Sequence, residues 1–186
     1  MMKKLTFLLL LMLIFIFRTP LPALADEPED GNILILNSYY RGFTWTDDEV
    51  DGILSSMSEH KWDYQISIEY MDWKRYPTQE NLRNFYNMMK MKYASKDIDV
   101  IVCTDDAAFQ FALTYRKELF SNAPVVFSGI NTEGLVQIAK GQDNYSGVME
   151  EINPEGTIRA ALAINPKIRN IYLVYDNTES GLSTGK

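Results

Sequence analysis

The chain has 186 residues, a formal net charge of −7 at pH 7, one cysteine and one histidine. The acidic charge disfavours nucleic acid and anionic lipid as partners, because both carry phosphate groups. A single cysteine excludes an internal disulfide and a cysteine-cluster metal site, and the single histidine, His60, argues against zinc chemistry and a histidine-based catalytic triad. We therefore expect no bound metal and no cofactor.

Residues 1–25 are predicted to be an export signal. Lys3 and Lys4 precede an apolar run over residues 5–17, and the tripeptide ALA at residues 23–25 matches a signal peptidase site. The run is shorter than the roughly 20 residues of a membrane span, which favours a cleaved signal over an uncleaved N-terminal anchor. Cleavage after Ala25 removes three basic residues and no acidic ones, so the formal charge changes from −7 to −10. We expect an extracytoplasmic protein, in the periplasm or at the cell surface.

From residue 32 onward, short apolar runs alternate with amphipathic stretches. Residues 46–49 (TDDE) match a capping box, which predicts the start of the first helix. Asn153 followed by Pro154 predicts the start of the last helix, which ends near residue 165. Other helices are predicted from residue 78, from residue 105 and over residues 133–139. Strands are predicted over residues 33–36, 64–71, 98–103, 124–127, 145–149 and 171–175.

This alternation predicts an α/β fold with a doubly wound parallel sheet, five-stranded over residues 32–150. In such sheets, ligands bind beyond the carboxyl ends of the strands. The candidate ligand-binding residues follow the predicted strands: Ser38, Tyr39, Trp45, Asp72, Asp105, Asp106, Ser128, Gly129, Asn131, Glu150 and Asp176.

The candidate residues indicate binding rather than catalysis, because no nucleophile among them is paired with a general base. Hydroxyl and amide groups suit a carboxylate or a polar headgroup, and Tyr39 or Trp45 can stack on a planar portion. Asp72 and Asp105 favour a ligand that carries an amine. We therefore expect a protein that is not an enzyme and binds a small molecule, such as an amino acid or a small organic acid.

Each candidate also has a purely structural interpretation. Asp105 can cap its helix, and Ser128-Gly129 can serve a tight turn. Asp72 can form a surface ion pair with Arg75, and Tyr39 and Trp45 can cover the edges of the core.

The last six residues, GLSTGK, are close to a phosphate-binding loop. Three residues separate Gly181 from Gly185, where the motif requires four. The spacing therefore argues against a nucleotide site.

Five segments carry a family resemblance, in order, over essentially all of residues 32–180. They are ILILNSYYRGFTWTDDEVDGI (33–53), YMDWKRY (70–76), VIVCTDDAAFQFALTYRKELF (100–120), APVVFSGIN (123–131) and YSGVMEEINPEGTIRAALAINP (145–166). They resemble the ABC-transporter-type substrate-binding domains, which are similar to type 1 periplasmic binding proteins. The resemblance implies two α/β lobes that close on a small solute.

The resemblance divides the chain into an N-terminal lobe over residues 26–150 and a crossover with a truncated second lobe over residues 151–186. Many domains of this family are the sensory regions of histidine kinases and diguanylate cyclases. The expected function is therefore the input region of a membrane signalling protein. The alternative is a free periplasmic substrate-binding protein of an ABC transporter. No cysteine precedes Cys103, which disfavours a lipid-anchored transporter subunit.

Two other classes compete with solute binding. A flavodoxin-like receiver or flavin carrier would use Asp105, Asp106 and Ser128, but a receiver needs an acidic pair where this chain has Asn37-Ser38. An extracytoplasmic hydrolase is disfavoured because the chain lacks a G-x-S-x-G motif.

Overall fold

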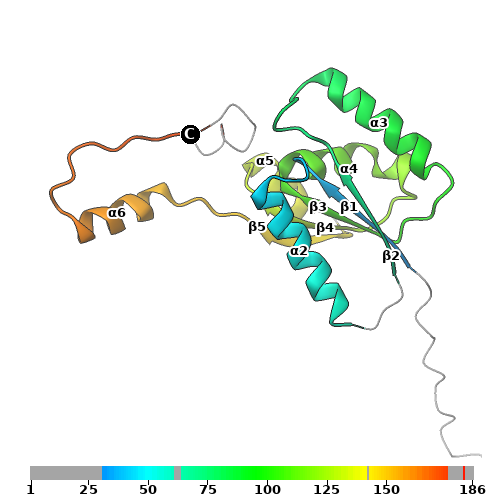
Figure 1. Ribbon diagram of the computed structural model, residues 1–186, viewed down its shortest axis with the longest axis horizontal. Coiled ribbons are helices and arrows are strands. Elements are labelled where there is room, and N and C mark those ends of the chain that lie inside the picture. The colour runs from blue at the N-terminus through cyan, green and yellow to red at the C-terminus, as the bar shows by residue number, and fades with distance from the viewer. Residues whose placement is uncertain (1–30, 61–63, 142, 176–181, 183–186) are drawn as a thin grey trace, which may run out of the picture.

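The computed structural model describes residues 31–60, 64–141, 143–175 and 182 (Figure 1). The strands are β1 (Gly31–Asn37), β2 (Tyr64–Tyr70), β3 (Val100–Thr104), β4 (Val125–Ile130) and β5 (Tyr145–Met149). The helices are α2 (Thr44–Ser58), α3 (Gln79–Tyr93), α4 (Asp105–Leu119), α5 (Glu133–Lys140) and α6 (Pro154–Ile164). The predicted export signal, Asp176 and the GLSTGK loop, apart from Leu182, lie outside the described residues.

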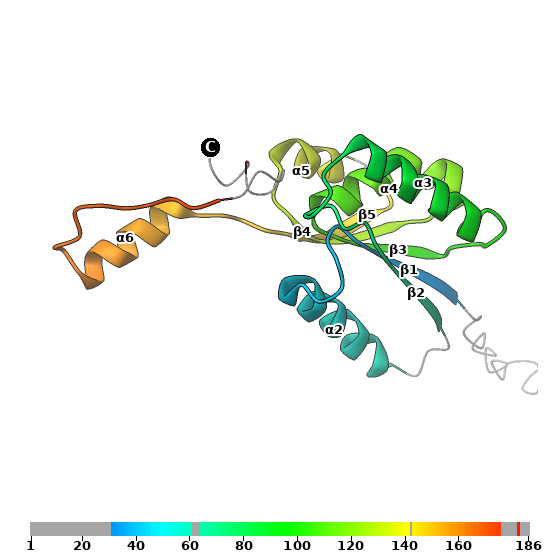
Figure 2. The same ribbon diagram turned by 45° about the horizontal axis from the view of Figure 1, so that its top comes forward.

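The strands form one parallel sheet in the order β2-β1-β3-β4-β5. Helix α2 covers one face, and α3, α4 and α5 cover the other (Figure 2). The chain steps from β1 to β2 in one direction and then crosses β1 to reach β3 in the other. Since parallel crossovers are right-handed, this reversal places the helices on opposite faces. The predicted α/β fold with a five-stranded parallel sheet is confirmed.

The core consists of two clusters, one on each face of the sheet. Along β1, Leu34 and Leu36 face the larger cluster under α3 and α4, whereas Ile33 and Ile35 face the smaller cluster under α2. Side chains alternate between the faces of a strand, so a strand buried on both sides needs the continuous apolar run that the sequence contains. Aromatic rings fill the larger cluster. The fully buried Phe109 lies 5.1 Å from Phe127 between ring centroids.

The α2 face of the sheet is covered only in part. Val126 of β4 is 43% exposed and Val148 of β5 is 71% exposed, and both face the α2 side. A groove of about 410 Å³ runs beside α2, with Met57, Val102 and Val126 among its lining residues. Helix α2 therefore shields β1 and leaves β4 and β5 accessible on this face.

The start of α2 differs from the prediction. The helix begins at Thr44, and its N-cap residue, Phe43, provides no side-chain hydrogen bond. Thr46 is buried within the first turn, so residues 46–49 do not form a capping box. The predicted box is wrong because Glu49 accepts a hydrogen bond from Ser128 on β4 instead.

The residues after β5 form a helix that contributes no residue to the two core clusters. The predicted cap is confirmed, because Asn153 Oδ1 accepts a hydrogen bond from the Gly156 N–H at 2.7 Å. Helix α6 has no buried residue and lies apart from the sheet in Figure 1. The predicted strand over residues 171–175 is wrong. This segment is exposed and pairs with no described strand, so its backbone lacks the ladder that defines a strand.

Within the described residues, no helix combines the length and the apolar character that crossing a bilayer requires.

The aromatic core predicts a large effect of one substitution. Phe109→Ala should lower the free energy of unfolding by about 3–5 kcal/mol, because it leaves a cavity beside Phe127 and Tyr145. The matched control is Met91→Ala on α3, whose side chain is exposed and should change stability by less than about 0.5 kcal/mol. Urea denaturation followed by circular dichroism measures both. Equal effects of the two substitutions would contradict the assigned core.

Candidate functional site

Strand register brings the carboxyl ends of β1, β3 and β4 to one level. Asn37 pairs with Thr104, and Thr104 pairs with Ser128, so these residues form a row across the sheet. The switch in strand order lies between β1 and β3, where ligands of open α/β sheets bind. The residues that follow this row therefore meet at the edge predicted to hold a ligand.

Two carboxyl groups face each other at this edge. Asp105 begins α4 and is only 4% exposed, while Glu49 comes from α2 and accepts a hydrogen bond from Ser128 Oγ at 2.9 Å. A Cβ atom at Gly129 would lie 3.2 Å from Asp105 Oδ1 and 3.4 Å from Glu49 Oε1. The missing side chain at Gly129 thus makes room for both carboxyl groups.

The backbone at this point is held in an unusual conformation. Gly129 has a φ of 73°, and Asp105 has a φ of 62°, which is uncommon for a residue with a side chain. Such conformations persist only where surrounding structure holds them, and they concentrate at binding sites. Thr104 occupies the N-cap position and Asp105 the first helical position, so the capping interpretation of Asp105 is wrong.

Burial, together with the negative charges of Glu49, Asp106 and Glu150, raises the pKa of Asp105 to about 8, against a lowering by a hydrogen bond with Trp45. Burial and the negative charge of Glu150 also raise the pKa of Glu49, although hydrogen bonds with Ser128, Trp45 and Asp105 oppose this shift. The carboxyl pair therefore retains a proton near neutral pH. Glu49 Oε2 and Asp105 Oδ2 are buried and have no hydrogen-bond partner.

Asp106 and Asn131 shape the loop after β4. Asp106 Oδ1 accepts hydrogen bonds from the N–H groups of Asn131 and Thr132, and its Oδ2 accepts one from the Thr132 hydroxyl at 2.7 Å. The Asn131 side chain donates to Glu150 Oε2 at 3.0 Å. Asp106 therefore anchors the loop, while Asn131 and Glu150 lie at the edge beside the carboxyl pair.

Ser38 is fully buried and joins β1 to α4. Its hydroxyl donates to the Thr104 carbonyl at 2.7 Å and accepts from the Ala108 N–H at 2.8 Å. The Ser38 hydroxyl therefore joins the end of β3 to the first turn of α4, so Ser38 positions α4 beneath the carboxyl edge.

The loops after β1 and β2 contain further predicted residues. Tyr39 is buried and packs edge-to-face against Phe43 with 5.5 Å between ring centroids, and the Lys74 ammonium lies 5.2 Å from both rings. The Asp72 carboxylate forms an ion pair with Arg75 at 2.6 Å, which confirms the ion-pair interpretation of this residue. Trp45 is 46% exposed. It is therefore the predicted aromatic residue that remains open to solvent.

Sequence reasoning missed Glu49, which the capping-box pattern had assigned to the helix start. One signal was available. Glu49 lies four residues after Trp45, so both side chains occupy the same face of α2.

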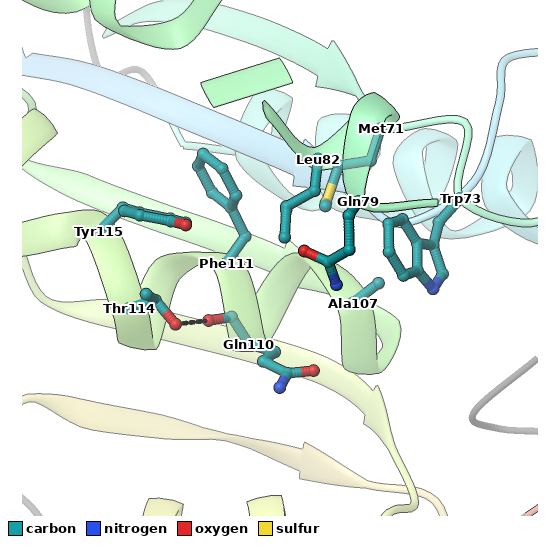
Figure 3. A pocket seen from close by; sticks show the side chains of 9 residues that line it. All are labelled: Met71, Trp73, Gln79, Leu82, Ala107, Gln110, Phe111, Thr114 and Tyr115. Atoms are coloured by element: carbon teal, nitrogen blue, oxygen red, sulfur yellow. Dashed lines mark hydrogen bonds between the residues drawn. The ribbon is translucent and has the colours of Figure 1, made fainter. Parts of the chain in front are cut away.

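A separate pocket of about 210 Å³ lies between α3 and α4 (Figure 3). Phe111 and Tyr115 of α4 line it, together with Leu82 of α3 and with Met71 and Trp73 from the loop after β2. Its walls are mostly apolar, and none of the candidate residues lines it.

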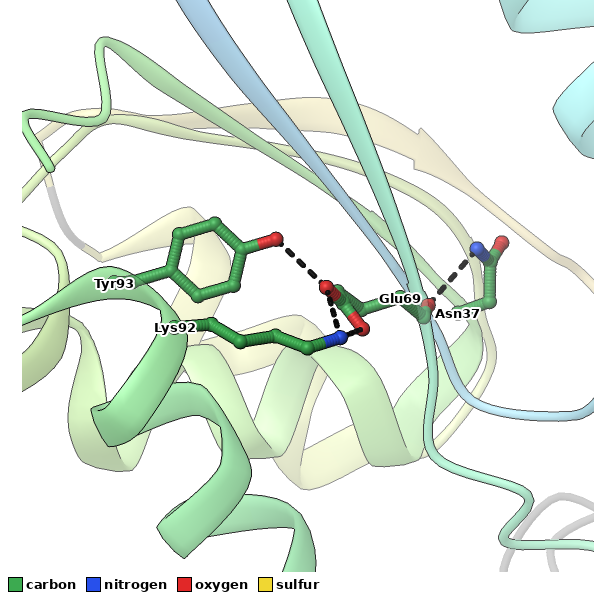
Figure 4. Close-up of polar contacts among 4 residues, drawn as sticks. All are labelled: Asn37, Glu69, Lys92 and Tyr93. Carbon is green, nitrogen blue, oxygen red and sulfur yellow. Dashed lines mark hydrogen bonds and ion pairs between the residues drawn. The ribbon is translucent and has the colours of Figure 1, made fainter.

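A buried polar network on β2 connects the sheet to α3 (Figure 4). The Glu69 carboxylate accepts hydrogen bonds from Lys92 Nζ at 2.9 Å and from the Tyr93 hydroxyl at 2.8 Å. Burial and the Glu69 hydrogen bond raise the pKa of Tyr93 well above its usual range. Glu69 and Lys92 form an ion pair in this network, whereas Glu49 and Asp105 at the carboxyl edge have no cationic partner among the described residues.

Among the described residues, no group of three or more His, Cys, Asp and Glu side chains is arranged to hold a metal ion. Comparisons with protein-family models, with curated proteins and with solved structures find no match.

Two carboxyl groups lie close to Gly129, so a methyl group at this position is predicted to destabilise the protein. Gly129→Ala should destabilise the protein by about 1–3 kcal/mol, because alanine must adopt a positive φ against two carboxyl groups. Gly134→Ala on α5 is the control. Its Cβ meets no atom within 4 Å, so stability should stay equal or rise by up to about 1 kcal/mol. Chemical denaturation of both variants tests this, and a neutral Gly129→Ala would show that the two carboxyl groups do not constrain the position.

The raised pKa of Asp105 predicts a pH-dependent loss of stability. The unfolded chain loses this proton near the ordinary value of 3.8, whereas the folded protein keeps it until about pH 8. Unfolding therefore becomes easier as pH rises between these values, by an amount on the order of several kcal/mol. Asp105→Asn removes the ionisation, so the variant should gain stability relative to the native protein between about pH 5 and about pH 8. Urea midpoints at both pH values measure the gain, and an identical difference at the two values would contradict the shift.

Proposed function

We propose that this chain is an extracytoplasmic solute-binding domain that recognises a small organic ligand at the carboxyl edge of its sheet. The observation that carries the proposal is the buried carboxyl pair Glu49–Asp105 beside Gly129. Leaving buried polar oxygens without partners is costly, and a bound ligand that donates hydrogen bonds to them would remove this cost.

The particular type of fold is part of the same proposal. The strand order and the position of the edge are compatible with the N-terminal lobe of a type 1 periplasmic binding protein, to which residues 26–150 would correspond. Residues 151–186 would then begin a second lobe. Support for this division comes from α6, which buries no residue against the sheet.

We further propose that the domain is the input region of a membrane signalling protein, with a free periplasmic transporter subunit as the alternative. In either case a membrane partner responds to the ligand. The domain itself carries out no reaction in this proposal.

The hydrolase alternative has one contact in its favour, the hydrogen bond from the Ser128 hydroxyl to Glu49. His60 does not complete a triad there. It follows the far end of α2, and the eleven positions between Glu49 and His60 correspond to roughly 16 Å of helix at 1.5 Å per residue. The contact therefore supports a polar binding surface better than an activated nucleophile.

Trp45 provides a test of the ligand site. Amino acids and small aromatic acids would be screened by thermal shift, and the hits measured by calorimetry. Trp45→Ala should weaken binding about two- to tenfold, because a stacked aromatic pair contributes about 0.5–1.5 kcal/mol beyond its buried area. Tyr172→Ala removes an aromatic ring that is 86% exposed and is not among the candidate site residues, so it should leave the affinity unchanged. A hit that binds equally to both variants would place its site elsewhere, and a screen without hits would count against solute binding.

A further inference from the structure

The charges around the carboxyl pair are of one sign. Glu49 comes from α2, Asp105 and Asp106 from α4, and Glu150 from the segment after β5. The neutral groups beside the pair are Ser128 of β4 and Trp45 of α2. No lysine or arginine of the described residues forms an ion pair with Glu49 or Asp105. The pair thus combines negative charge with restricted access to water.

Two other acidic side chains near the sheet each have a cationic partner. Asp72 pairs with Arg75 at 2.6 Å, and Glu69 pairs with Lys92 at 2.9 Å. The Glu49–Asp105 pair differs in that Asp105 is almost fully buried while its Oδ2 has no donor. Glu49 Oε2 has none either. Two buried carboxyl oxygens from different elements therefore lack hydrogen-bond partners at the same place.

The geometry points to a ligand that carries a monovalent organic cation, an ammonium or guanidinium group, bound between Glu49 and Asp105 in exchange for a proton. This inference rests on the proposed solute-binding function and names the chemistry of its ligand. The N–H groups of such a cation would donate to Asp105 Oδ2 and Glu49 Oε2. Trp45, which is partly exposed beside both carboxyl groups, offers an aromatic surface that favours a cation.

The exchange of a proton for the cation conserves atoms and charge. In the free protein one proton resides on the pair, predominantly on Asp105, and the pair carries one negative charge. When the cation enters, the O–H bond of Asp105 breaks and its proton leaves to solvent. The pair then carries two negative charges, one of which the ligand neutralises.

A divalent metal fits the site less well than an organic cation. Calcium takes six to eight oxygen ligands and magnesium demands octahedral geometry, whereas two carboxyl groups meet here. The N–H groups of an organic cation can also donate directional hydrogen bonds to Asp105 Oδ2 and Glu49 Oε2.

Methylguanidinium and methylurea form a suitable pair of probes, because they have nearly the same shape and differ in charge. Each would be titrated into the purified full chain, and binding would be followed by the backbone amide resonances of Asp105 and Gly129. Methylguanidinium should shift both resonances and methylurea should not. Guanidinium stays charged over the whole range, so its affinity should rise about tenfold from about pH 7 to about pH 9, as the site loses its proton.

Substitutions at Asp105 and Glu49 test whether methylguanidinium binding depends on this carboxyl pair. Asp105→Asn should weaken methylguanidinium binding at least tenfold at about pH 9 and abolish the pH dependence. Glu49→Gln should also weaken binding, and should move the pH dependence to lower pH because one negative neighbour is lost. Asp48→Asn, an exposed carboxylate one position before Glu49, is the matched control and should behave as the native protein. Amide spectra report whether each variant folds, and either pair variant alone suffices for the test.

The outcomes distinguish the inference from the proposed function. Binding of methylurea or acetate at these resonances without binding of methylguanidinium would overturn the cation assignment and leave solute binding intact. Binding of methylguanidinium with the same affinity at both pH values would overturn the proton exchange. Absence of any shift would also overturn the cation assignment, whereas the library screen with Trp45→Ala tests solute binding independently of charge.

Discussion

The central constraint on this structure is the position of β1, which is hydrogen-bonded to β2 on one side and to β3 on the other and is covered on both faces. Its residues Leu34, Ile35 and Leu36 are fully buried. Because the chain leaves β1 in one direction and returns past it in the other, the loops after β1 and β3 diverge at its carboxyl end. The opening between them is where the candidate site forms.

The site depends on neutral hydrogen bonds that hold charged groups in place. The Thr104 hydroxyl donates to Asn37 Oδ1, and Ser38 bonds both to β3 and to the start of α4. These contacts fix the first turn of α4 and hold Asp105 at a positive φ. The cost of that conformation, and of burying its carboxyl group, is offset by the packed cluster under α3 and α4. The stability of the packed core thus compensates for the strained backbone and the buried carboxyl group at the edge.

Helix α2 contributes both to the core and to the carboxyl edge of the sheet. Val50 and Ile53 pack toward the sheet, while Trp45 and Glu49 reach the carboxyl edge. The cluster that holds α2 is the smaller of the two, and part of the sheet beside it stays exposed. Elements with fewer buried apolar contacts open at lower free energy, so α2 is the part of the site most able to adjust to a ligand.

The sequence alone determined the α/β class, the five strands and the edge where polar residues gather, because hydrophobic periodicity and strand–helix alternation are local signals. It also determined the cap at Asn153, whose hydrogen bond spans only three residues. Only the tertiary structure decided how the polar residues are used. Ser38 and Asp106 form hydrogen bonds within the protein, and Glu49 accepts a hydrogen bond from Ser128, 79 positions away, instead of forming the expected capping box. The strand expected over residues 171–175 failed for the same physical reason: a strand exists only through a neighbouring strand, and its local sequence cannot supply one.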